Sequence, residues 1–220
     1  MHKYFRIEEY KVLAYRLLLA YVFYGIARIL FTIYNFKLLG SPGIFEFFKL
    51  YYHGLIFDTA GILYVNAIFI LLSILPFRIN TWKIFQKFQF CVYFLFNLLA
   101  YATNFIDFIY FKFILTRSTL ASLESIQHES NKAILLFSFV KSYWHVFFLF
   151  IVLSIIWVYL YRLWNLKNKR PQNLVAYYGL SIVCFFVIII LMVGAIRGGD
   201  FKKSTRPINM VDANRHVNSS

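Results

Sequence analysis

The chain has 220 residues, of which 61% are hydrophobic and 15% are charged, and its mean hydropathy is +0.65. Soluble domains carry about 25% charged residues, so this composition excludes a soluble domain and indicates an integral membrane protein. The length suffices for several spans but not for a bundle plus an enzyme domain of roughly 100–200 residues. A formal net charge of +14 would suit nucleic-acid binding. The Lys and Arg residues lie between apolar runs, however, as membrane topology demands, so we expect no nucleic-acid partner.

Five apolar segments are long enough to cross a bilayer, which takes about 20 helical residues. Their apolar runs are continuous, whereas membrane-spanning strands alternate. The sequence therefore predicts an all-α membrane protein, a bundle of about five transmembrane helices. The spans are expected near residues 12–36, 54–76, 88–110, 143–163 and 174–196.

The distribution of positive charge predicts how these spans are oriented. Ten Lys and Arg residues crowd the N-terminal segment and two short alternate loops: Lys3, Arg6, Lys11, Arg78, Lys83, Lys87, Arg162, Lys167, Lys169 and Arg170. The positive-inside rule then places the N-terminus in the cytoplasm. Because the basic N-terminus lacks a small-residue cleavage site, it is expected to be a retained first span. With five spans, the C-terminal tail lies outside the cytoplasmic membrane.

Several side chains are expected at the membrane–water interfaces. Arg16 lies one turn beyond Lys11, close enough to extend its charge to the cytoplasmic interface. Aromatic belts are expected at the two ends of the fourth span. The residues that would form them are Tyr143, Trp144, Tyr159, Tyr161 and Trp164.

The outer loop at residues 113–141 places Leu120, Leu123 and Ile126 at helical spacing. This pattern predicts an interfacial helix lying on the outer leaflet. The alternative, functional interpretation of this loop is a metal site at His128 and Glu129. Adjacent residues point to different sides of a helix and no third ligand is near, so we expect no metal there.

Three charged residues within the spans, Arg28, Asp58 and Asp107, are expected in the same outer half of the membrane. A charge at the bilayer centre costs about 2.5–3.5 kcal/mol on insertion scales, so such residues usually face the bundle interior. On the third span, Asn97, Tyr101 and Asn104 follow one another at helical spacing and form a stripe that leads toward Asp107.

Two interpretations of these polar residues remain open. In the first, Arg28 and Asp58 form an ion pair and the Asn residues hydrogen bond across helices, as polar groups in membrane bundles often do. In the second, the six residues form a polar pocket that opens to the outer leaflet and binds a lipid headgroup.

A catalytic centre cannot be assembled from the sequence. The nine acidic residues and five His residues are scattered, whereas metal-assisted phosphate or sulfate chemistry needs several of them to converge. Gly198 and Gly199 follow a span, so they do not form a phosphate-binding loop before a helix. Cys91 and Cys184 lie within apolar runs, where free thiols serve as small packing groups. We therefore expect no cofactor in this chain.

Three segments together resemble the N-terminal membrane portion of the lipoteichoic acid synthase-like family, which belongs to the alkaline phosphatase and sulfatase superfamily. They are HGLIFDTAGILYVNAIFILLSILP (53–76), NFIDFIYFKFILTRST (104–119) and GAIRGGDFKKSTRPINMVDANRHVN (194–218). The resemblance implies a bundle of about five helices with the N-terminus in the cytoplasm. It also implies a large extracytoplasmic α/β domain, in which a threonine nucleophile and manganese or magnesium transfer phosphoglycerol or cleave phosphate or sulfate esters.

By this resemblance, residues 1–196 are a multi-pass transmembrane domain and residues 197–220 are an extracytoplasmic linker toward a catalytic domain outside the 220 residues. The expected function is to anchor that domain, with membrane lipids and a lipid-linked substrate as further partners. No nucleophile or metal ligand can be assigned to a position in this chain. The alternative is a stand-alone small membrane protein that acts as a lipid-binding scaffold or transporter.

Overall fold

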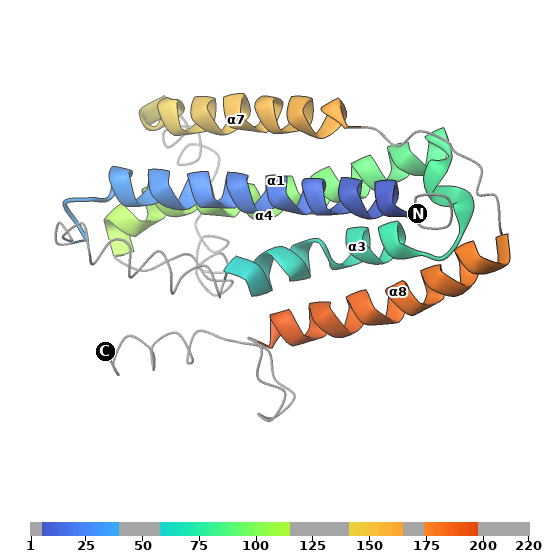
Figure 1. Ribbon diagram of the computed structural model, residues 1–220. Helices are drawn as coiled ribbons and strands as arrows, with labels where there is room; N and C mark the ends of the chain where they lie inside the picture. The colour runs from blue at the N-terminus through green and yellow to red at the C-terminus, as the bar shows by residue number, and fades with distance from the viewer. Residues whose placement is uncertain (1–5, 40–57, 115–140, 165–173, 198–220) are drawn as a thin grey trace, which may run out of the picture.

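The computed structural model describes residues 6–39, 58–114, 141–164 and 174–197 (Figure 1). These residues are almost entirely helical, and no strand occurs in the described ranges, so the prediction of an all-α protein is confirmed. The helices are α1 (Ile7–Tyr34), α3 (Ala67–Ile74), the 3-10 helix η1 (Arg78–Thr81), α4 (Lys83–Ile114), α7 (Trp144–Leu163) and α8 (Leu174–Ile196). Residues 58–65 are also helical and lead into α3.

Successive segments run in alternating directions between two ends of the bundle (Figure 1). We call the end that holds residue 6 the amino-terminal end and the opposite end the distal end. Helix α7 runs against α1, because Tyr34 near the end of α1 hydrogen bonds to His145 near the start of α7, and Tyr15 bonds to the carbonyl of Leu160. Helix α4 runs parallel to α1, since the side chain of Asn35 donates to the carbonyl of Phe108.

Four described helices are long and apolar enough to cross a membrane: α1, α4, α7 and α8. The chain therefore has the character of a multi-pass membrane protein. The second expected span, near 54–76, corresponds to residues 58–65 and α3. In the described part of the chain these are two short helical stretches, and together they are shorter than the expected span. The expected interfacial helix at 113–141 and the linker at 197–220 lie almost entirely outside the described residues.

Two helices begin several residues before the apolar segments that predicted them. Helix α1 begins at Ile7, five residues before the expected span, and its first turn carries Glu8 and Glu9. Carboxylates there are favoured by the partial positive charge of a helix N-terminus. Helix α4 begins at Lys83. Helix α3 ends where Leu75 leaves helical geometry, with ψ of 131°, because the following Pro76 disfavours helical geometry at the residue before it.

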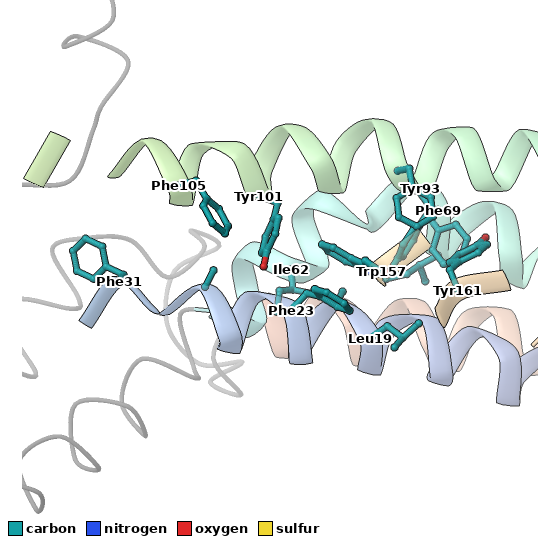
Figure 2. Packing of buried hydrophobic residues seen from close by; sticks show 14 of the residues in the cluster. Leu19, Phe23, Phe31, Ile62, Phe69, Tyr93, Tyr101, Phe105, Trp157 and Tyr161 are labelled. Carbon is teal, nitrogen blue, oxygen red and sulfur yellow. Dashed lines mark hydrogen bonds between the residues drawn. The ribbon is translucent and has the colours of Figure 1, made fainter. Parts of the chain in front are cut away.

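An aromatic core joins α1, α4 and α7, and Trp157 of α7 lies at its centre (Figure 2). Its indole stacks on Phe23 of α1 with ring centroids 4.6 Å apart, and it meets Tyr101 of α4 edge-on at 5.3 Å. The indole N–H donates to the hydroxyl of Tyr93 at 3.1 Å, and that hydroxyl donates to the carbonyl of Arg16 at 2.8 Å. The three helices are thus held by both packing and a hydrogen-bonded chain.

Helix α8 lies at the edge of the bundle (Figure 1). It packs against α3, whereas α4 packs against α1, α3 and α7. In the most apolar stretch of α4, 50% of the residues are buried, compared with 11% in α8. In a bilayer, the apolar side chains of α8 would therefore face mostly lipid.

Candidate functional site

The ion pair of the first interpretation, between Arg28 and Asp58, is present. The Nη2 atom of Arg28, on α1, donates a hydrogen bond to Oδ1 of Asp58, the first described residue of the neighbouring segment. The two side chains are 17% and 23% exposed, so the pair is only partly buried. It joins α1 to the 58–65 helix near the distal end.

Asn97 of α4 forms a reciprocal amide pair with Asn66, and both side chains are fully buried. Asn97 Nδ2 donates to Asn66 Oδ1 at 2.7 Å, and Asn66 Nδ2 donates to Asn97 Oδ1 at 3.1 Å. The hydroxyl of Tyr24, on α1, donates to the Asn97 carbonyl at 3.3 Å. Such bonds satisfy amides inside a membrane bundle and fix neighbouring helices together, as the first interpretation of the Asn residues expects for Asn97.

The other members of the predicted stripe lie in different surroundings. Tyr101 is buried in the aromatic core and points from α4 toward Phe23 of α1 (Figure 2). Asn104 is half-buried and donates to the carbonyl of Ala100 on its own helix at 2.9 Å. Asp107 is buried near the end of α4. The predicted cluster therefore divides into a buried part, with Asn97 and Tyr101, and the partly exposed pair of Arg28 and Asp58.

A second polar group, which sequence reasoning missed, occupies the amino-terminal end. We call it the amino-terminal network; it consists of Arg6, Glu9, Arg16, Ser73, Asn80, Gln89 and Tyr177. Its hub is Glu9: Oε2 accepts bonds from Arg6 and from Asn80 Nδ2, the latter at 3.2 Å, and Oε1 accepts from the hydroxyl of Tyr177 at 3.1 Å. One carboxylate thereby connects α1, the turn around η1 and the start of α8.

Arg6 closes this network at the start of α1. Its guanidinium forms an ion pair with Glu9 and donates to the carbonyl of Leu75. Burial by itself disfavours the charged form of Arg6, but the hydrogen bond and the negative charge of Glu9 outweigh that effect. The pKa of Arg6 consequently lies above its ordinary value, and its charge is retained at any physiological pH.

Two expectations about the interface are wrong at this end. Arg16 is only 2% exposed, so its charge does not extend freely to the interface; its guanidinium lies over the ring of Tyr161, 4.2 Å from the centroid. Tyr161 is buried with it and does not belong to an aromatic belt. The cause is the same in both cases: the ring of Tyr161, together with that of Phe69 on α3, offers the Arg16 cation a favourable face inside the bundle. Tyr159 and Trp164 are exposed, as the belt requires.

The described residues offer no obvious catalytic arrangement. In the described ranges, no three His, Cys, Asp or Glu side chains come together in a way that could hold a metal ion. Cys91 and Cys184 are free thiols; Cys91 is exposed and Cys184 is half-buried, so neither is the fully packed group that the sequence predicted. His128 and Glu129, the residues considered for a metal site, lie outside the described residues.

The two polar groups differ in chemical character. The Arg28–Asp58 pair is a partly exposed charge pair, whereas the amino-terminal network is a largely buried set of amides, hydroxyls, a carboxylate and two guanidinium groups. The shared effect of their described bonds is to join helices. No protein-family model, curated protein or solved structure matches this chain, so its function is inferred from its own residues.

Proposed function

We propose that this chain is the membrane-anchoring domain of an enzyme similar to the lipoteichoic acid synthases. In this proposal an extracytoplasmic, sulfatase-like domain carries the threonine nucleophile and the manganese or magnesium ion. That domain transfers phosphoglycerol or cleaves phosphate or sulfate esters. The helical bundle holds it at the membrane surface, where its lipid-linked substrate resides.

The observation that best supports anchoring is that polar side chains inside the bundle bond to one another across helices. Asn66 and Asn97 satisfy each other, Glu9 joins three segments, and Arg28 pairs with Asp58. A transport pathway needs polar groups that can bind and release a substrate, often on interrupted helices in repeated halves. Groups committed to helix–helix bonds instead favour a rigid support.

We further infer five spans with the N-terminus in the cytoplasm. Residues 58–74 contact Arg28 at one end, and the adjoining Leu75 contacts Arg6 at the other. This segment therefore follows α1 over most of its length and would cross the same apolar layer. Five crossings would leave the tail after residue 197 on the outer side, where the proposed catalytic domain works.

The second candidate is a stand-alone protein that binds lipid headgroups. The partial exposure of Arg28 and Asp58 favours it, because a guanidinium near the outer leaflet suits an anionic phosphate. This candidate needs no additional domain, and the two proposals therefore differ in what accompanies the bundle.

An antiserum raised against the 220-residue chain tests the proposed function in native membranes. We expect it to detect either a polypeptide well above 26.2 kDa or a bundle of that mass that crosslinks to a sulfatase-like protein. The isolated native species should turn over phosphate or sulfate esters with manganese or magnesium, whereas the purified 220-residue chain should not. A native product of 26.2 kDa without such a companion would contradict the proposal, as would metal-dependent turnover by the chain alone.

A further inference from the structure

A small cavity lies within the amino-terminal network, between α1, α3, η1 and α4. Its volume is about 10 Å³, and its polar lining consists of Glu9, Arg16, Ser73, Asn80 and Gln89. Two apolar residues of α1 complete the wall. The space is close to the minimum that holds one water molecule, roughly 10–15 Å³.

Two polar atoms on the cavity-lining residues have no hydrogen-bond partner among the described residues: the Nε–H of Arg16 and the Oε1 atom of Gln89. Both side chains are almost completely buried, at 2% and 1% exposure. Buried polar groups are nearly always satisfied, because leaving one unpaired removes its bonds to water without replacement. Two residues that line the cavity therefore carry one unsatisfied donor and one unsatisfied acceptor.

We propose that this cavity binds a single ordered water molecule that bridges Arg16 Nε and Gln89 Oε1. Water can accept from the guanidinium N–H and donate to the amide oxygen at the same time. A halide could accept from Arg16, but it would face the amide oxygen of Gln89 and the carboxylate of Glu9. A metal cation could bind those oxygens, but it would face the Arg16 guanidinium. Only an amphoteric molecule of this size suits every polar group around the cavity.

The bridging water would complete the amino-terminal network. Gln89 Nε2 already donates to Asn80 Oδ1 at 3.3 Å, and Asn80 donates to Glu9. Adding the water continues this chain from Arg6 and Glu9 through Asn80 and Gln89 to Arg16. It would also hydrate the charge of Arg16, whose guanidinium otherwise lies over the rings of Tyr161 and Phe69.

The direct test is an experimental structure of the full chain at a resolution that shows ordered water, determined once in chloride and once in bromide. We expect one peak within hydrogen-bond distance of both Arg16 Nε and Gln89 Oε1, without an anomalous bromide signal. A bromide signal at that position would replace the proposal with a halide site. An empty cavity, or a peak that contacts only one of the two atoms, would overturn it.

A thermal melt in detergent gives an independent test through Arg16→Met, Gln89→Met and the double variant. Each single change removes one partner of the water and leaves the opposite group poorly satisfied, so each should lower the melting temperature by several degrees. The double variant should lose clearly less than the sum, because it removes both polar groups. Lys87→Met, at an exposed lysine of α4, controls for general loss of positive charge and should change little. Strictly additive losses would show that Arg16 and Gln89 share no bridging molecule. If a variant does not fold, the unmodified structure decides the question.

Discussion

Replacement of Trp157 by alanine should destabilise the bundle by about 3–5 kcal/mol, the usual cost of truncating a buried large aromatic residue. Trp157 is fully buried, stacks on Phe23 and contacts Tyr101 edge-on. The change also removes the indole donor from the hydroxyl of Tyr93. Because these contacts join α7 to α1 and α4, the loss should appear as early separation of α7 in unfolding measurements in detergent.

The same helix provides a matched control. Trp144 belongs to α7 as well, but it is 63% exposed and lies at the distal end. Trp144→Ala should therefore cost about 1 kcal/mol or less, as surface substitutions usually do. Equal losses for the two tryptophans would contradict the assignment of Trp157 to the centre of the core.

Arg28→Leu should produce the second large effect. Removing one partner of a buried ion pair typically costs about 3–5 kcal/mol, since the other charge is left uncompensated. Here the side chains are 17% and 23% exposed, so solvent or headgroups would reduce the loss toward the lower end of that range or below it. Adding Asp58→Leu should recover much of the stability, because the stranded carboxylate is then gone. Thermal melts of the single and double variants measure both steps.

The same variants separate the two proposed roles of Arg28. If Arg28 binds an anionic lipid head, Arg28→Leu should leave the melt nearly intact and abolish co-purifying phospholipid. The double variant would not restore that lipid, since the cation is still absent. Lys37→Leu, at an exposed residue just beyond α1, controls for a general loss of positive charge at the distal end. A melt and lipid content that both remain unchanged in Arg28→Leu would contradict both roles.

Hydropathy was sufficient to predict the four long helices α1, α4, α7 and α8, because a bilayer leaves a chain few other ways to satisfy its backbone polar groups. It also located Arg28 and Asp58 at the same end of adjacent segments, where they do form an ion pair. The side of each helix that faces the core was harder to predict. Helix α7 is apolar all round, so no stripe in its sequence distinguishes buried Trp157 from exposed Ile155 and Ile156.

The amino-terminal network could not be predicted for a different reason. Glu9, Asn80 and Tyr177 are distant in sequence and meet only because three helix ends pack together. One local signal was available: Glu9 and Arg16 are seven residues apart and so lie on one face of α1. Residues near the start of a membrane helix are readily assigned to the interface. Because Arg16 was assigned in this way, its burial was not predicted.

The most direct test of the account is the sidedness of the two ends in intact cells. Two single-cysteine variants are made in a background with Cys91→Ser and Cys184→Ser. Each replaces one exposed tryptophan: Trp82→Cys at the amino-terminal end, or Trp144→Cys at the distal end. A membrane-impermeant maleimide should label the Trp144→Cys variant in intact cells and label the Trp82→Cys variant only after permeabilisation. This result would place the distal end on the side where the proposed catalytic domain works. The reverse pattern, or labelling of both variants in intact cells, would contradict an anchor with a cytoplasmic N-terminus.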